Sequence, residues 1–508
     1  MIMIKTIKKL AFLFIALAGL QSCNKWLEAT SSTQVTDATL FSSRSGFQDA
    51  LCGVYISMGD EAEYGSQWSW FVNELAYGPY AQQSSPLFTA IQNHEWEGNY
   101  ANPLISQMWK AGYFSIANAN KVLEELEAKP DVVSDRIEWN LMKGELLALR
   151  AYIHFDLMRM FGLVQLSDAD YEKYTVPYVT AYDKEPTPQR TYRETLALLE
   201  DDLNTAVSLL EDDPIRGKAS EAWLINANAD GFWDARDKRM NYFAAKALKA
   251  RVLLFRYELD AAAALAQEVI TEATAAGACQ WVDADAMTKA TSNDVIDWTF
   301  SSEQLFSLEV TGLQSLTDAY IFNTLGSGSS SILIDKAIAD VSLFDTATIP
   351  ASEDIRGPAL MLKFYGNQYR PYKYYNNSSY YADYRNRIPM IKLSEMYMII
   401  AEVAAEKKDQ DKLFQALIDV RSHRGIQDPS PINCDPNFIS PNYWFSGLLM
   451  EIVREFNGEN VGYFAARRIS PKAHAWVNID ANWVHRIISL TPYCYPTDEL
   501  SYGRHQDL

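Results

Sequence analysis

The sequence predicts a mainly α-helical protein. Degenerate helix pairs, similar to tetratricopeptide units, are expected to form a scaffold that is interrupted by long, irregular insertions with minor β-structure. Two observations predict this fold class. Apolar residues recur at three- and four-residue steps in several segments, which is typical of amphipathic helices. Other long segments lack this period and are rich in Gly, Ser, Asn, Tyr and Trp.

The first 23 residues have the pattern of an export signal. Lysines precede an apolar run over 10–20, and this run is too short to span a bilayer as a helix. The run ends in Leu-Gln-Ser-Cys at 20–23, which resembles a bacterial lipobox. We therefore expect 1–22 to be a lipoprotein signal peptide and Cys23 to be lipidated. Multiple acyl chains on this cysteine would hold the protein firmly at a membrane surface.

The chain of 508 residues is acidic, with 65 Asp and Glu against 45 Lys and Arg and a formal net charge of −20. Such a surface repels phosphates, so composition argues against nucleic acid and anionic lipid headgroups as ligands. No segment after residue 22 has the length and apolarity of a membrane span. We therefore expect the lipid anchor to be the protein's only attachment to the membrane.

Helical periodicity places the scaffold in two blocks, 104–275 and 390–456. In the first block, helices are expected over 108–126, 139–162, 191–210, 241–257 and 260–275. In the second, they are expected over 391–407, 410–423 and, as the last helix, 447–455. Their spacing does not follow the ~34-residue period of a regular tetratricopeptide array, so the pairs are degenerate.

Three loop-rich insertions separate these helices, over 59–103, 217–239 and 277–389. The third contains a Gly-Ser tract at 326–331 and a run of tyrosines over 365–384. Long irregular segments inside a compact domain are usually either functional or disordered, and this aromatic content argues against disorder. These insertions are therefore the expected location of the functional site.

The sequence offers no motif for catalysis or for a metal. Its five cysteines include no CxxC, and its six histidines form no HxxxH pair. The GxSxG, HExxH and Walker-type patterns are missing, and the carboxylate spacing that a glycosidase needs cannot be read from sequence. We predict no catalytic residue, no metal ligand and no cofactor. A structural calcium ion and the pairing of the cysteines stay open, although packed free thiols are favoured.

Three sets of residues, in this order along the chain, resemble the SusD/RagB family of Bacteroidetes surface lipoproteins. The first is the start Cys23-Asn-Lys-Trp-Leu-Glu28 with Gly46 to Tyr55. The second is a helix pair, from Trp109 to Asn120 and from Gly144 to Gly162. The third is a C-terminal block that runs from Ile388 through Arg424-Gly425 and Arg454-Glu455 to Tyr495-Pro-Thr-Asp-Glu-Leu500.

The resemblance implies one SusD-like domain over 23–508 and a binding function without catalysis. It also implies a partner, a SusC-like TonB-dependent β-barrel transporter, and a lipid-anchored position on the cell outer membrane that faces the exterior. Arg150, Arg421 and Glu455 stand in helices beside apolar residues. We expect these three residues to form ion pairs that join helices rather than a ligand site.

Candidate ligand residues follow from the chemistry of sugars, which present flat C–H faces and many hydroxyls. Exposed Trp or Tyr rings bury the faces, and amide side chains bind the hydroxyls. In the resemblance the loop before the first helix pair contributes to the glycan site, so Trp96 and Asn99 are the first candidates. The others are Trp68, Trp70, Asn73, Trp281, Trp298, Tyr320 and Tyr372. For each ring, the alternative is a core aromatic that anchors its loop.

The predicted function is capture of an oligosaccharide and its delivery to the transporter. Two alternatives stay open at this stage. The cargo could be a peptide, which some relatives take, or the chain could be a helical-repeat scaffold that binds only proteins.

Overall fold

The computed structural model describes residues 37–82, 84–322, 331–344, 349–350, 352–376, 384–431, 436–473, 475–476 and 478–503. The predicted signal peptide and Cys23 lie outside these residues. The fold is mainly helical, as the sequence predicts, and its named strands form sheets of only two or three strands. Within the described ranges, no helix combines the length and the apolarity that crossing a bilayer would require.

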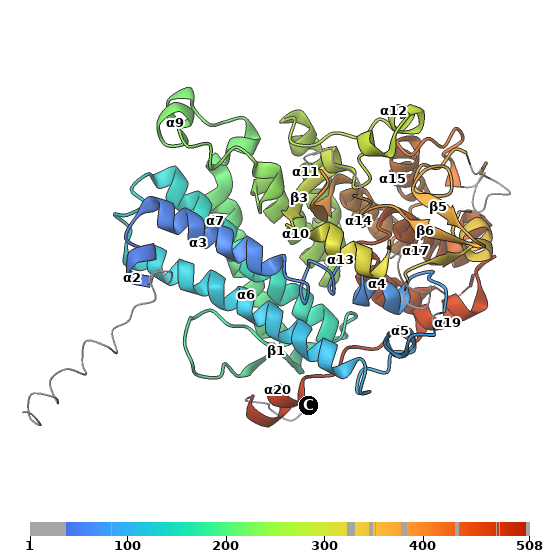
Figure 1. Ribbon diagram of the computed structural model, residues 1–508, viewed down its shortest axis with the longest axis horizontal. Helices are drawn as coiled ribbons and strands as arrows, with labels where there is room; N and C mark the ends of the chain where they lie inside the picture. Colours follow the sequence, from blue (N-terminus) through green and yellow to red (C-terminus); the bar gives the residue numbers. More distant parts are fainter. Residues whose placement is uncertain are drawn as a thin grey trace, which may run out of the picture.

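The N-terminal part of the scaffold is a series of helices that pack in sequence order. Neighbouring members of the series are in contact: α3 with α6, α6 with α7, α7 with α8, α8 with α10 and α10 with α11. Figure 1 shows α3, α6 and α7 running across the left of the molecule. The bounds are α2 (Asp37–Leu40), α3 (Arg44–Met58), α6 (Asn102–Ala128), α7 (Arg136–Phe161), α8 (Tyr192–Leu209), α10 (Tyr242–Phe255) and α11 (Leu259–Ala275).

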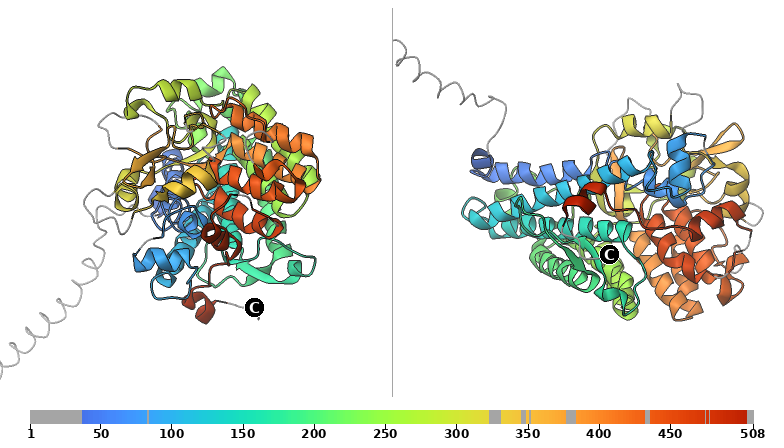
Figure 2. Two further views of the ribbon diagram at one scale, coloured as in Figure 1. Left: turned by 90° about the vertical axis from the view of Figure 1, so that its right-hand side faces the viewer. Right: turned by 90° about the horizontal axis from the view of Figure 1, so that it is seen from below.

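The C-terminal part continues this series, because α14 packs against α11 and then against α15 and α17. The two views of Figure 2 show these orange and red helices grouped together, beside the blue and green N-terminal helices. The bounds are α14 (Leu393–Glu406), α15 (Gln410–Ser422), α17 (Trp444–Glu455), α18 (Val461–Ile469), α19 (Ala481–Ile488) and α20 (Thr497–Tyr502). The prediction that 447–455 is the last helix is therefore wrong. Helices α18, α19 and α20 have only 9, 8 and 6 residues, too few turns for a clear period.

Local signals in the sequence explain why the predicted helices are found almost where they were expected. Helix α8 begins with a capping box, in which Thr191 and Glu194 each satisfy the other's backbone N–H. Helix α7 begins after Asp135, which accepts a hydrogen bond from the backbone of Glu138, and it ends at Gly162. A Cβ atom at Gly144 would lie 2.8 Å from Cγ of Leu210, so this glycine allows close packing.

The insertions contain short helices and all of the strands except β1, β2 and β7. Strand β3 pairs antiparallel with β7, and the other sheet has the order β4-β6-β5. The short helices are α4 (Val72–Tyr77), α5 (Pro86–Gln92), α9 (Glu221–Asn226), α12 (Ala284–Lys289) and α13 (Leu313–Tyr320). The strands are β1 (Tyr174–Pro177), β2 (Gln189–Thr191), β3 (Gln304–Glu309), β4 (Ile334–Asp335), β5 (Leu362–Tyr365), β6 (Gln368–Pro371) and β7 (Arg387–Lys392).

The cysteines within the described residues, Cys52, Cys279 and Cys494, are free thiols, as the sequence favours. The remaining two, Cys23 and Cys434, lie outside the described residues.

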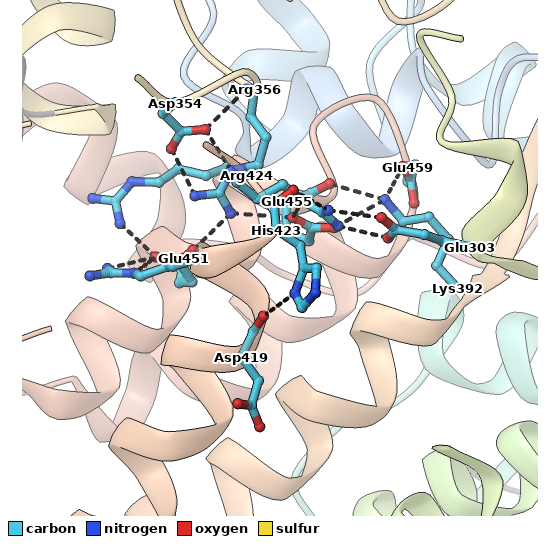
Figure 3. Close-up of polar contacts among 12 residues, drawn as sticks. Glu303, Asp354, Arg356, Lys392, Asp419, His423, Arg424, Glu451, Glu455 and Glu459 are labelled. Atoms are coloured by element: carbon cyan, nitrogen blue, oxygen red, sulfur yellow. Dashed lines mark hydrogen bonds and ion pairs between the residues drawn. The ribbon is translucent and has the colours of Figure 1, made fainter. Parts of the chain in front are cut away.

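A buried network of charged side chains joins the longest insertion to the C-terminal helices (Figure 3). Glu455 of α17 accepts hydrogen bonds from Nε and Nη2 of Arg424, at 2.9 and 2.6 Å. Arg424 also donates to both carboxylate oxygens of Glu303, at 2.8 and 2.7 Å. One turn before Glu455, Glu451 lies 2.7 Å from Arg421. These side chains are fully buried.

The network extends in two further directions. Arg356 of the insertion pairs with Asp354 and reaches Glu451 at 2.7 Å. Lys392, at the end of β7, lies 2.9 Å from Glu459, which also binds Lys373 at 2.5 Å. Each buried charge in this group therefore faces a charge of opposite sign.

Arg150, Arg421 and Glu455 form ion pairs that join helices, as the sequence predicts. Arg150 of α7 binds Asp202 of α8 through two nitrogens, at 2.6 and 2.8 Å. Arg421 and Glu455 join α15, α17 and the segment after α15. Burial alone would raise the pKa of the Glu455 carboxyl, but the charges of Arg424 and Lys392 and hydrogen bonds from Arg424 hold it well below its usual range.

Replacing Glu455 with Ala tests the network. The change leaves Arg424 buried without half of its acceptors, and removing one partner of a buried ion pair costs about 3–5 kcal/mol. We expect a loss of that size in the free energy of unfolding, measured by urea denaturation. The control is Glu127→Ala, which removes the surface pair of Glu127 with Lys143 and should cost about 0–1 kcal/mol. Equal midpoints for the two variants would contradict the network's importance.

Candidate functional site

The candidate site is an open cleft of about 880 Å³ on the right side of Figure 1, between α5, the β4-β6-β5 sheet and α19. The insertion 59–103 contributes the segment around Tyr80 and the end of α5. The insertion 277–389 contributes β4, the π-helix Ile338–Leu343 and the turn between β5 and β6. Helix α19 closes the third side. The cleft thus exists only where segments far apart in the sequence meet.

Two sets of contacts hold together the segments that form the cleft. Tyr80 makes a β-bridge to Ile334, and the backbone N–H of Ala81 donates to the carbonyl of Leu333 at 2.8 Å. Trp483 of α19 is completely buried, and its indole N–H donates to the carbonyl of Tyr77 at 2.8 Å. The N-terminal insertion is therefore fixed to both the sheet and α19.

The cleft lining combines apolar and polar groups and is rich in side-chain amides. Each aspartate of the lining already has a partner: Asp335 accepts from Gln368 at 2.8 Å, Asp340 pairs with Lys336, and Asp480 caps α19. Arg486 donates to the carbonyl of Tyr80 at 3.0 Å, and burial lowers the pKa of its guanidinium. The amides of the lining are Gln82, Gln92, Asn93, Asn367 and Asn482.

An exposed aromatic ring lies next to this lining. Phe364 of β5 is 62% exposed and packs edge-on against Tyr369 of β6. The ammonium of Lys336, which lines the cleft, lies 5.7 Å from the centre of the Tyr369 ring. Phe364 itself is not among the lining residues, but it stands on a strand of the same sheet and offers a flat apolar surface there.

Comparison with known proteins agrees with this architecture. A SusD-like family model with the description "Starch-binding associating with outer membrane" matches residues 25–221. A SusD superfamily protein from Bacteroides thetaiotaomicron is 20% identical, with a TM-score of 0.65 over 87% of this chain and 93% of its own. The chain has the SusD fold. The resemblance to the SusD/RagB family is thereby confirmed.

Two further solved structures have the same fold. A SusD-like carbohydrate-binding protein from Bacteroides vulgatus is 18% identical, with a TM-score of 0.61 over 84% of this chain and 83% of its own. A SusD superfamily protein from Bacteroides fragilis is 18% identical, with a TM-score of 0.63 over 91% of this chain and 99% of its own. No curated protein matches the sequence.

Most of the aromatic residues that the sequence suggested as sugar platforms are part of the core of this protein. Trp68, Trp70, Trp96 and Trp298 are at most 5% exposed. The indole of Trp96 donates to Oγ1 of Thr491 at 3.0 Å, and that of Trp70 donates to the carbonyl of Gly65. A ring that is packed on both faces has no surface for a sugar. The structure therefore corrects these four assignments in favour of loop anchoring.

Asn73 is also fully buried, and its amide holds the loop together. Its Nδ2 donates to the carbonyl of Trp68 at 2.8 Å, and its Oδ1 accepts from the hydroxyl of Tyr493 at 2.5 Å. Gly112 of α6 makes room for the same loop, because a Cβ atom there would lie 2.5 Å from Cη2 of Trp68. Asn73 therefore has a structural role, which corrects its assignment to a ligand.

The other candidate rings are half-buried and stacked on protein rings. Trp281 stacks on His423, Tyr320 on Phe71 and Tyr372 on Tyr375, with centroids 4.2 to 4.5 Å apart. Each offers at most one face or an edge to solvent. Asn99 is exposed, as a ligand-binding amide should be, but it is not among the residues that line the cleft.

Sequence reasoning missed the residues that do line the cleft. The sequence-based candidates are mainly aromatic residues, whereas the lining is made mostly of amide, charged and apolar side chains and includes no tryptophan. Asn93 and Asn367 lie inside the predicted insertions, so composition pointed to the region but not to the residue. Asn482 and Arg486 lie in α19, which the sequence did not predict, and no local signal pointed to them.

The buried carboxyl group of Glu74 binds Tyr80, one of the residues that line the cleft. Glu74 is fully buried and accepts hydrogen bonds from the hydroxyls of Tyr80 and Tyr77, at 2.9 and 3.0 Å. Burial raises the pKa of the Glu74 carboxyl to about 8, although these hydrogen bonds and the charge of Lys373 oppose the shift. At neutral pH this carboxyl is therefore mostly protonated.

This pKa predicts how stability depends on pH. Because the folded-state pKa of Glu74 lies above that of the unfolded chain, its contribution is complete below about pH 4.5 and is lost as the pH rises towards 8. Glu74→Gln keeps a neutral group and removes the titration. We expect this variant to gain up to about 5 kcal/mol relative to wild type between these two pH values.

The measurement is urea unfolding across this pH range. The control is Glu97→Gln, which neutralises an exposed carboxylate of the same insertion and should leave the pH dependence of wild type unchanged. A Glu74→Gln variant with the pH profile of wild type would show that the buried group is not a titrating one.

Proposed function

We propose that this protein binds an oligosaccharide in the cleft between α5, the β4-β6-β5 sheet and α19. The observation that supports the proposal most is the lining of that cleft. Side-chain amides both donate and accept hydrogen bonds, which suits the hydroxyls of a sugar. The exposed ring of Phe364, on a strand of the same sheet, offers a surface for the apolar side of a pyranose.

The family description adds support for this class of ligand. The matching family is described as starch-binding, and one relative of the same fold is called a carbohydrate-binding protein. The proposed mechanism is non-covalent capture, without catalysis. Asn99, the exposed residue of the original candidates, stays a proposed contact for a longer glycan that extends beyond the cleft.

The proposal includes the position of the protein and its partner. The family is described as associating with the outer membrane, and the lipobox at 20–23 would supply the anchor through Cys23. We propose a location on the exterior of the outer membrane, beside a SusC-like TonB-dependent β-barrel that receives the glycan.

Calorimetry of the soluble protein, made without residues 1–23, tests the cleft against panels of glycans and peptides. Asn367→Ala and Asn482→Ala should each weaken binding of the recognised glycan roughly two- to tenfold, since a lost hydrogen bond is worth about 0.5–1.5 kcal/mol. The matched control is Asn204→Ala, an exposed amide on α8 outside the cleft, which should bind as wild type does.

Three outcomes would contradict this proposal. Unchanged binding in both cleft variants would move the site elsewhere on the protein. Binding of peptides in place of glycans would favour the peptide-uptake alternative. Binding of neither ligand would favour a scaffold that contacts only proteins.

Replacing Cys23 with Ser tests the anchor. Without the thiol, no acyl chain can be attached, so the protein should move from the membrane fraction to the soluble fraction of the producing cells. Cys52→Ser, which changes an exposed free thiol, is the control and should stay with the membrane. A Cys23→Ser protein that stays with the membrane would contradict lipid anchoring at this residue.

A further inference from the structure

Two cations face each other across the hairpin of β5 and β6. Lys363 and Arg370 are directly opposed in the antiparallel register. Gly366, with a φ of 67°, and Asn367 form the turn that sets this register. Cross-strand neighbours of like charge destabilise a β-hairpin, so this pair needs a compensating charge.

Neither cation has a carboxylate partner among the residues that the structure describes. Arg370 is only 8% exposed, and its buried Nε has no hydrogen-bond partner. Lys363 is half-buried, and burial alone lowers the pKa of its ammonium. The contrast with the rest of the protein is clear, since the formal net charge is −20 and the buried cations of the ion network all face carboxylates.

Aromatic rings surround the pair. The guanidinium carbon of Arg370 lies 4.0 Å from the centre of the Tyr365 ring, which is 47% exposed. The ammonium of Lys363 lies 5.5 Å from the ring of Trp298 and 6.0 Å from that of Tyr372. These contacts orient the two cations, but the rings offer no negative charge.

We propose that Lys363 and Arg370 bind an oxyanion, a carboxylate or sulfate group, on an acidic sugar. An arginine fork binds such planar or tetrahedral oxyanions through paired N–H donors, and a nearby ammonium adds charge. The ring of Tyr365, backed by Arg370 on one face, would support the sugar that bears the anion. The assignment to a sugar rests on the proposed function, whereas the preference for an anion rests on the two cations.

This anion site is distinct from the cleft. Neither Lys363 nor Arg370 lines the cleft, although the strand register puts them on the same face of the sheet as Asp335, which does. Asn367 in the connecting turn lines the cleft. One chain of sugars that extends along the hairpin would therefore contact both sites.

The experiment is calorimetry of the soluble protein, without residues 1–23, against three matched probes. These are an oligogalacturonate, the same oligomer with its carboxylates methyl-esterified, and a sulfated galacto-oligosaccharide. We expect at least one charged probe to bind tenfold or more tightly than the esterified one, and its affinity to fall with added NaCl. Lys363→Gln and Arg370→Gln should each remove most of this difference and leave binding of the neutral probe unchanged.

Thermal unfolding without any sugar gives a second readout. Lys363→Gln removes a half-buried ammonium whose desolvation no carboxylate offsets, so the unliganded variant should melt at a higher temperature than wild type. The matched control for both measurements is Lys143→Gln on α7, which makes the same change of charge at a lysine paired with Glu127. This control should keep the preference for charged sugars.

The outcomes separate the two proposals. Neutral glycans that bind, with equal affinity for charged and esterified probes in every variant, would overturn the anion site and leave the glycan function standing. Stabilisation by inorganic sulfate alone, with no binding of any sugar, would overturn the assignment to a sugar. A Lys363→Gln variant that melts lower than wild type would contradict the uncompensated burial of charge on which the site is built.

Discussion

The buried charge network around Glu455 and Arg424 is the interaction on which the rest of the structure depends. Most protein cores are held by apolar contacts, but here a long insertion without helical period must be fixed to a helical scaffold. Glu303 and Arg356 of that insertion meet Arg424 and Glu451 in a fully buried cluster. Such pairs require near-ideal geometry because desolvation is costly, so they specify one arrangement of the two parts.

A short series of contacts connects this charge network to the sheet that forms part of the cleft. Lys373, which follows β6, binds Glu459 after α17, and the hydroxyl of Tyr374 donates to the carbonyl of Gly458 at 2.7 Å. These contacts hold the β4-β6-β5 sheet beside the C-terminal helices. The same sheet carries Asn367 and the opposed cations of the hairpin. Both proposed ligand sites are therefore built on a rigid base, although they lie in segments that look irregular in the sequence.

The aromatic residues illustrate a general limit of reasoning from sequence. A tryptophan in a polar, glycine-rich loop has the composition of a sugar platform, but the same ring is also the largest apolar surface available to anchor that loop. In this protein Trp68, Trp70 and Trp96 are buried and anchor their loops, whereas side-chain amides line the cleft. Burial decides between the two roles, and burial is a property of the folded chain.

The sequence by itself determined the helical fold class and the order of the long helices. It also determined the helix-joining role of Arg150, Arg421 and Glu455. These features depend on local periodicity, caps and charge placement, which act within a few turns of the chain. Only the tertiary structure decided that Asn93, Asn367 and Asn482 share one cleft and that Lys363 faces Arg370. Those neighbours are brought together by strand register and by packing between distant segments, and neither leaves a periodic signal in the sequence.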